Sequence, residues 1–495
     1  MWIIVAALFL VSLLVVYSAT AAMAYREVDG NTSYYLFRQA RFIMIGFFFI
    51  IVVHWIDYKY YARYAKALFK LSVVLVLLAY VVGISLNEAS RWIKIPGLGF
   101  TFQPSELLKV TLVVVLAQQL GMRQGVIARL AVLPPLTPGG WGRNPQRSFE
   151  IWYKTTKPLI LPIVVSALVV LPANFSTAAI LWGTCMIMLM IGRVRQSELN
   201  RLMGVTALAT VLIVGGMYVA GLGRAQTWVN RFVQFTGLSE AVVDDRQASQ
   251  DSYQVQQAEI AIASGGVVGK GPGNSTQRSQ LPHPYSDFAY AFIIEEYGIV
   301  GGIVVFVLYL WIFYRAGLIV RRCNRPSQGL MVLGLSLIIT MQAFVNMAVS
   351  VGLIPVTGQP LPLISMGGSS VLFTCVAMGM ILGVSRESER ELLEQQAAAA
   401  AAMREGVLPE SSAATEPAGE TIPEESPVAP LRRPLVFRGG GGSTAKRGRS
   451  ARADEAAPEE ELTLVDRGDP SAWEADGLAG DRREVIDLID DEDDE

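Results

Sequence analysis

Long apolar blocks in the first 390 residues limit this chain more strongly than any other feature of its sequence. Blocks dense enough to span a bilayer run over residues 2 to 24, 42 to 56, 67 to 86, 105 to 121, 157 to 173, 176 to 192, 202 to 221, 288 to 314, 328 to 352 and 367 to 385. A helix needs ~20 apolar residues to cross a hydrocarbon core about 30 Å thick, and these blocks approach that length. The pattern predicts an all-α polytopic membrane protein with about ten transmembrane helices.

Composition excludes several other classes of protein. The chain is 52% hydrophobic, and its formal net charge of −2 averages a weakly basic apolar part with an acidic C-terminal segment. No basic face that would bind nucleic acid is predicted. Three cysteines have no zinc-binding or redox spacing, so we interpret them as apolar packing residues: Cys185, Cys323 and Cys375.

The distribution of positive charge predicts the orientation of the chain. An even number of spans puts both termini on one side, and lysines and arginines concentrate in loops at 59–66, 123–157, 193–201 and 315–325. By the positive-inside rule these loops and both termini are cytoplasmic. The protein is therefore expected to be a multi-pass protein of the cytoplasmic (inner) membrane, with the loop from about 87 to 104 and the segment 223–287 facing outward.

The same pattern divides the chain into two domains. Residues 1–390 are expected to form the ten-helix membrane domain, in which 223–287 is a large extracytoplasmic loop between spans seven and eight. Within that loop, residues 250–264 have a helical pattern that ends at Gly265 and Gly266, and a turn-rich stretch follows. Pro172 predicts a tight helical hairpin between spans five and six. Residues 391–495 are predicted to be a cytoplasmic, mostly disordered acidic tail.

Two ionisable residues stand at the head of the fourth span. Glu106 and Lys109 are three residues apart on one helix face, close enough to pair. Ser105 is expected to cap the helix start, where Glu106 also meets the positive end of the helix dipole. Charged groups inside apolar spans are costly and are candidates for function by default. A structural ion pair that only fixes packing is the alternative.

Asp287 lies where the outer loop enters the eighth span. One interpretation is a helix-capping aspartate. The other is a general base in a half-buried, outward-facing site, where desolvation favours proton uptake. Glu295 and Glu296 follow in the same span, and at least one of them must face the bundle interior or a water-filled cavity.

An uncharged loop at 352–370 is rich in Pro, Gly and small hydroxyl residues. Such a loop is suited to dip back into a helical bundle, where its backbone groups line a polar cavity or contact a phosphate-bearing ligand. A plain turn is the alternative. Asn346, in the preceding span, is expected to face inward. The absence of a Walker loop, a zinc-ligand cluster and a Gly-x-Ser-x-Gly elbow argues against an ATP-driven pump and other enzymes that depend on those motifs.

Four motifs in the same order make residues 1 to 390 resemble the SEDS family, the shape, elongation, division and sporulation proteins. They are RWI at 91–93 with QPSE at 103–106 and Lys109; the glycine pattern at 265–273 with NSTQ at 274–277, LP at 281–282 and DF at 287–288; EEYG at 295–298; and the loop at 352–370. The GNS at 273–275 resembles the division branch, FtsW, more than the elongation branch, RodA. The chain departs from the family pattern at Asn174, where Asp is common, at 284–286, and at Met366, where Tyr is usual.

This resemblance implies a peptidoglycan glycosyltransferase that polymerises lipid II into glycan strands at the outer face of the cytoplasmic membrane during cell division. It implies that Asp287 is the general base, taking the proton from the acceptor 4-hydroxyl. The expected substrate-binding residues, which balance the pyrophosphate charge or line the cavity, are Arg91, Lys94, Glu106, Lys109, Gln277, Glu296 and Ser369. A divalent cation, Mg or Mn, would assist, although no ligand cluster in the sequence indicates one.

The resemblance also implies partners, namely a class B penicillin-binding protein that acts as transpeptidase and other divisome proteins. Two other functions fit ten spans with buried charges: a lipid II flippase or other transporter, and a non-catalytic divisome scaffold. A flippase should concentrate its charges near the membrane midplane. The sharpest motif here, around Asp287, lies instead at the outer rim, which favours the polymerase.

Overall fold

The computed structural model describes residues 1–20, 24, 31–86, 89–94, 101–125, 127, 152–154, 156–221, 225–236, 246–277 and 287–404. These residues belong to the first of two compact units, Met1–Arg404, and the second unit is Glu405–Glu495. The predicted disorder of the tail from residue 405 onward therefore concerns residues outside the described ranges. Residues 128–151 of the basic loop and the stretch 278–286 also lie outside the described ranges.

Within the described residues, eight helices are long and apolar enough to cross a membrane. They are α1 (Trp2–Ala19), α3 (Thr32–Trp55), α4 (Tyr58–Val82), α5 (Pro104–Met122), α9 (Gln196–Val219), α12 (Ala289–Val320), α13 (Pro326–Ser350) and α14 (Gly368–Arg404). Two shorter apolar helices, α7 (Lys157–Val170) and α8 (Phe175–Ile191), form the predicted hairpin. Each predicted block thus has its helix, which confirms the all-helical polytopic membrane fold.

Several helices extend beyond the apolar blocks that predicted them. Helix α3 begins at Thr32 rather than at 42, and α4 begins at Tyr58 rather than at 67. The reason is that backbone hydrogen bonding continues through polar turns, which a count of apolar residues leaves out. Helix α14 likewise continues through charged residues to Arg404, so residues 391–404 are helical.

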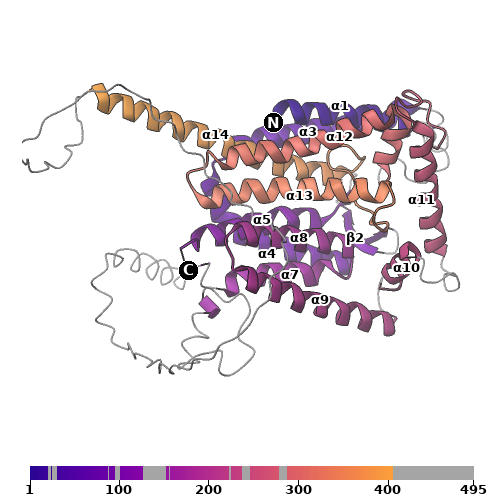
Figure 1. Ribbon diagram of the computed structural model, residues 1–495, viewed down its shortest axis with the longest axis horizontal. Coiled ribbons are helices and arrows are strands. Elements are labelled where there is room, and N and C mark those ends of the chain that lie inside the picture. Colours follow the sequence, from indigo (N-terminus) through magenta and orange to yellow (C-terminus); the bar gives the residue numbers. More distant parts are fainter. Residues whose placement is uncertain are drawn as a thin grey trace, which may run out of the picture. The chain divides into compact units, whose positions relative to one another are not determined.

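The core of the bundle lies around α13. This helix contacts α5, α8, α12 and α14, and Figure 1 shows it between α12 and α5. Its apolar side chains, such as Met331, Leu335 and Ala343, are fully buried. Helix α9 is the opposite case, because Leu199 and Leu202 are its buried residues and most of its other residues are exposed. A helix that is apolar on all sides and still exposed fits a membrane span.

A small sheet covers part of one end of the bundle. Strands β1 (Ile84–Leu86), β2 (Ala89–Lys94) and β3 (Thr101–Phe102) pair antiparallel in that order, with Ile93 opposite Phe102. The Phe102 ring packs against Phe373 of α14 with 5.6 Å between ring centroids. The sequence predicts a loop here, because strands this short leave no usable alternation of polar and apolar residues.

Two helices outside the bundle lie at the same end, as Figure 1 shows. They are α10 (Ala225–Thr236) and α11 (Arg246–Gly265). Helix α11 confirms the predicted helix at 250–264, and Gly266 follows it with φ +58°, which a glycine adopts without strain. Ala258 of α11 packs with Phe288, Ala291 and Val349, so α11 is anchored on the start of α12 and the end of α13.

Candidate functional site

The first turn of α5 places a charged pair in the bundle interior. Lys109 Nζ lies 2.8 Å from Glu106 Oε1 and donates to Gln342 Oε1 of α13 at 2.7 Å. Glu106 and Lys109 are each only 5% exposed. The predicted pairing is therefore confirmed, and a third partner, Gln342, completes it. Because both charges are buried, each depends on the other for compensation.

The predicted cap of this helix was wrong. Helix α5 begins at Pro104 with Gln103 as its N-cap, and Ser105 lies inside the first turn. Proline is favoured at the first helical position because its fixed φ suits the helix and it has no N–H to satisfy. The Ser105 hydroxyl instead accepts a hydrogen bond from Gln103 Nε2 at 3.0 Å.

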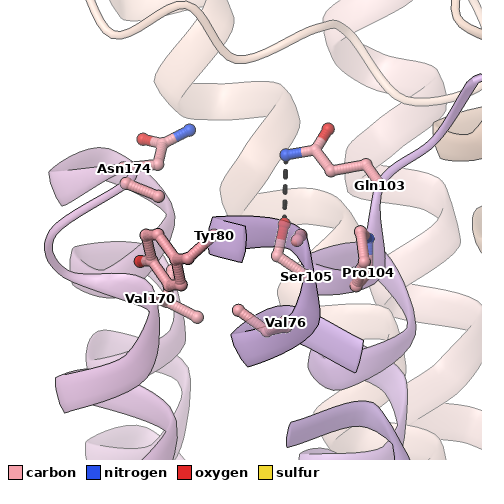
Figure 2. Close-up of a pocket in the computed structure, with 9 residues that line it drawn as sticks. Val76, Tyr80, Gln103, Pro104, Ser105, Val170 and Asn174 are labelled. Carbon is pink, nitrogen blue, oxygen red and sulfur yellow. Dashed lines mark hydrogen bonds between the residues drawn. The ribbon is translucent and has the colours of Figure 1, made fainter. Parts of the chain in front are cut away.

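Two cavities adjoin this first turn. One is a small cavity between α5, α13 and α14, lined by Glu106, Lys109 and Gln342 together with Phe373, Thr374 and apolar residues. The other small cavity is shown in Figure 2 and lies between α4, the start of α5 and the turn between α7 and α8. Its apolar wall includes Val76, Ala79 and Val170, and its polar side chains are Tyr80, Gln103, Ser105 and Asn174. The QPSE..K motif thus contributes to both cavities.

The glycine-rich loop after α11 forms backbone hydrogen bonds with α12 where that helix is kinked. Helix α12 is kinked at Gly298, whose φ of +70° and ψ of −176° are not helical. Lys270 N and Gly271 N donate to Glu295 O and Glu296 O at 3.0 and 2.9 Å. In return Ile299 N and Val300 N donate to carbonyls of the loop, at Gly266 and Val267. The loop therefore supplies hydrogen-bond partners on both sides of the kink, which a bundle interior requires.

Close backbone contact explains the glycines of this motif. A Cβ on Gly269 would lie 2.2 Å from Glu296 O, and one on Gly298 would lie 2.1 Å from Val267 O. Gly269 and Gly298 also have positive φ, of 88° and 70°. Any larger residue would push the loop away from the helix.

The carboxylates of Glu295 and Glu296 hold the same loop. Glu295 is fully buried and accepts from Lys270 Nζ at 2.7 Å, from Thr276 N at 2.9 Å and from the Ser275 hydroxyl. Glu296 is 1% exposed and accepts from Gly273 N at 3.0 Å and from the Ser18 hydroxyl of α1. Both glutamates face the interior, as predicted for at least one of them. Their observed contacts are with the protein itself.

Asp287 lies two residues before Ala289, the first residue of α12. The N-cap of that helix is Phe288, so the interpretation of Asp287 as the capping residue was wrong. Its side chain is half-buried, and Oδ2 lies 3.8 Å from the position a Cβ on Gly358 would occupy. The carboxyl group therefore borders the loop between α13 and α14. The backbone oxygen of Asp287 accepts from Asn346 Nδ2 at 2.8 Å.

The loop between α13 and α14 enters the bundle, as its composition predicted. Gln359, Leu361, Leu363, Ile364 and Ser365 are each at most 4% exposed. Five of its carbonyl oxygens accept hydrogen bonds from side chains of four helices. The pairs are Val356 with Arg231 of α10, Gln359 with Asn346 and Pro360 with Gln342 of α13, Pro362 with Tyr309 of α12, and Ile364 with Ser12 of α1. Irregular backbone inside a membrane protein needs this kind of satisfaction.

The other predicted site residues lie in different surroundings. Lys94 is exposed on β2, and the backbone of Arg91 is in the same strand, while its side chain lies outside the described part of the structure. Ser369 is 1% exposed in the first turn of α14. Gln277 is half-buried, and its backbone N–H donates to Glu295 Oε1 at 3.3 Å. The described residues include no cluster of three or more His, Cys, Asp or Glu side chains that could hold a metal ion, so the divalent cation stays a prediction.

Three polar residues of this region are not among the site residues predicted from the sequence: Thr177, Gln342 and Gln359. Gln359 Nε2 donates to Thr177 Oγ1 at 2.9 Å, and Gln342 bridges Lys109 and Pro360. A signal was available for Gln342, because it precedes Asn346 by four residues in an apolar span and so shares its helix face. Nothing in the sequence indicated the contact between Gln359 and Thr177.

Comparison with known proteins agrees with this architecture. The family model described as cell cycle protein, which covers FtsW, RodA and SpoVE, matches residues 1–390. The chain belongs to this family, the SEDS proteins. A protein of Halomonas elongata named probable peptidoglycan glycosyltransferase FtsW is 30% identical over 405 residues, which are 80% of this chain and 93% of the relative. A Bacillus subtilis protein of the same name is 28% identical over 75% of this chain and 86% of its own.

Solved structures share the fold. One, described as a peptidoglycan synthase complex that coordinates polymerization and crosslinking, matches with a TM-score of 0.55 and 22% identity over 76% of this chain and 96% of the other. The rod shape determining protein RodA of Thermus thermophilus matches with a TM-score of 0.51 and 22% identity, covering 78% of this chain and 95% of RodA. At these identities the match supports the arrangement of helices, not the roles of single residues.

Proposed function

We propose that this protein is a peptidoglycan glycosyltransferase of the division type, which polymerises lipid II at the outer face of the cytoplasmic membrane. The observation that carries the proposal is the position of Asp287. Its half-buried carboxyl group lies at the end of a span, beside the re-entrant loop, and the backbone there is held by Asn346. Membership of the SEDS family and relatives named as probable FtsW glycosyltransferases support the reaction class.

In the proposed reaction, Asp287 acts as general base. The acceptor 4-hydroxyl attacks the anomeric carbon of the donor sugar, and its proton passes to the Asp287 carboxylate. A new C–O bond forms between the sugars, and the bond from the anomeric carbon to the pyrophosphate oxygen breaks. The undecaprenyl pyrophosphate leaves with the bonding electrons, and the proton on Asp287 is then released to solvent.

The pyrophosphate needs positive charge, and the candidate cations differ in how they can provide it. Lys109 is paired with Glu106, so its charge is already compensated inside the bundle. Lys94 is the exposed last residue of β2, the middle strand of the sheet, so it can reach an anionic ligand at the surface without uncovering a buried charge. We therefore assign the direct contact with pyrophosphate to Lys94 and leave Glu106, Lys109 and Ser369 to line the interior of the site.

The proposed location of the reaction follows from the orientation predicted for the chain. With both termini in the cytoplasm, the outer end of the bundle holds Asp287, the sheet and helices α10 and α11. A class B penicillin-binding protein is the proposed partner, since one solved relative is described as a synthase complex that joins polymerization to crosslinking. Other divisome proteins would localise this complex.

Polymerisation of purified lipid II by the reconstituted protein with its partner tests the proposal. Asp287→Asn should lower the rate by about 10²- to 10⁴-fold, the range that general-base catalysis contributes. Glu259→Gln makes the same chemical change at an exposed carboxylate of the neighbouring helix α11, and it should leave the rate unchanged. A folded Asp287→Asn protein that polymerises at the wild-type rate would refute the role of Asp287. Translocation of lipid II without strand growth by the wild type would favour the transporter.

A further inference from the structure

Asn346 joins the two chain segments that meet at Asp287. It is 1% exposed in α13, and its Nδ2 donates to Asp287 O and to Gln359 O, each at 2.8 Å. A side-chain amide nitrogen carries two hydrogens, so these two bonds use both. One side chain of the rigid central helix thus fixes the start of α12 and the re-entrant loop together.

The backbone of Asp287 precedes the helical residues of α12, and its carbonyl oxygen accepts from Asn346. The first hydrogen bond of that helix runs from Phe292 N to Phe288 O at 3.2 Å, one residue beyond Asp287. A carbonyl just outside a helix needs another partner when it is shielded from water. Asn346 provides such a partner, so α13 helps to hold the Asp287 backbone in place.

The second bond of Asn346 fixes what surrounds the Asp287 carboxyl group. Gly358 borders Asp287 Oδ2, and the next residue, Gln359, is held by Asn346 through its backbone oxygen. Gln359 also donates from Nε2 to Thr177 Oγ1 at 2.9 Å, which ties the loop to α8. One amide therefore binds both the backbone of Asp287 and the loop that borders its carboxyl group.

We propose that Asn346 is a positioning residue for Asp287, an inference that rests on the proposed function of Asp287 as general base. Asn346 reaches Asp287 through backbone atoms, so it acts on the placement of the carboxylate. A displacement of about 1 Å at a catalytic group costs on the order of 10²-fold in rate. Substrate contacts at Lys94 and the start of α5 do not involve Asn346. Loss of its amide should therefore lower kcat and leave KM for lipid II unchanged.

Asn346→Leu tests this, because leucine has a similar size and no donor. In proteoliposomes that hold the full chain with its transpeptidase partner, we expect kcat to fall about 10²-fold. KM should stay within about two-fold of the wild type, since binding groups are intact. Thr340→Val is the matched control, because Thr340 is 4% exposed on the same helix and donates to Ser336 O within it. This control should retain the wild-type kcat.

Asn346→Ser covers the case in which the leucine variant does not fold. Serine leaves room for a water molecule that can satisfy both carbonyls without fixing their spacing, so the same loss of kcat is expected. Either folded variant with the wild-type kcat overturns the proposal, as does a loss expressed only in KM. Failure of both variants to fold also overturns it in favour of a purely structural role. If the wild type and Thr340→Val make no glycan, the proposed function itself has failed, and this result is distinct from the others.

Discussion

Lys109 Nζ lies 2.8 Å from Glu106 Oε1 in an interior where both residues are 5% exposed. The two residues are one turn apart at the start of α5, and Gln342 binds the same ammonium group at 2.7 Å. Both residues of this pair line the cavity beside α14. Its balanced charge lets an apolar bundle contain an ammonium and a carboxylate at the same place.

Removing one charge of this pair should destabilise the protein more than removing both charges. Lys109→Met leaves the Glu106 carboxylate buried without compensation and should lower the free energy of unfolding by ~3–5 kcal/mol. The double variant Glu106→Gln, Lys109→Met should recover most of this loss, because no unpaired charge remains. Thermal unfolding of the three detergent-solubilised proteins measures the coupling. Equal destabilisation in the single and the double variant would show that the charges do not compensate each other.

Gly298→Ala should detach the glycine-rich loop from α12. The new Cβ would meet Val267 O at 2.1 Å, and alanine at φ +70° and ψ −176° costs roughly 1–3 kcal/mol before any clash. We expect faster hydrogen exchange at Lys270 and Gly271, whose N–H groups bind the carbonyls at the kink. Gly204→Ala is the matched control, because no atom lies within 4 Å of its Cβ position in α9. Unchanged exchange in Gly298→Ala would contradict the docking role of the loop.

The spans and the interior pair could be predicted because they depend on local patterns. Apolar runs of spanning length have one stable environment, and Glu106 with Lys109 share a helix face at a spacing of three residues. The boundaries of α3 and α4 could not be found in this way, since helical hydrogen bonds pass through polar residues that carry no apolar signal. Pro104 also outweighed Ser105 as a start signal for α5, because fixed φ and a missing N–H suit the first helical position.

The long-range contacts of the site were beyond sequence reasoning. Gln359 and Thr177 are 182 residues apart, and only the fold brings their side chains together. The motifs at 295–298 and 265–273 were recognised as separate signals. In the structure they bind each other, because the glycine-rich loop forms hydrogen bonds with the backbone on both sides of the Gly298 kink. Composition marked the loop at 352–370 as re-entrant, yet it could not say which four helices satisfy its carbonyl oxygens.

Asn174 should tolerate aspartate and not alanine. Its side chain caps α8 by accepting from Thr177 N at 3.2 Å, and an aspartate oxygen can accept the same bond. Asn174→Ala should cost about 1 kcal/mol of stability, whereas Asn174→Asp should be neutral or slightly stabilising because a negative charge suits a helix N-terminus. Unfolding midpoints of the two variants measure this. Equal losses in both would mean that Asn174, which lines the cavity in Figure 2, matters through its amide nitrogen.

Lys94→Ala should weaken substrate binding without changing stability. Lys94 is exposed on β2, so its removal leaves no buried group unpaired and the unfolding midpoint should stay the same. If Lys94 contacts the pyrophosphate, KM for lipid II should rise about tenfold, the equivalent of roughly 1.4 kcal/mol. The increase should shrink at high salt, because an exposed charge is screened within a Debye length of about 10 Å at 0.1 M. Lys59→Ala removes an exposed lysine at the start of α4 and should not affect KM. The same KM in Lys94→Ala and wild type at low salt would remove Lys94 from the site and return the pyrophosphate contact to Lys109 or Arg91.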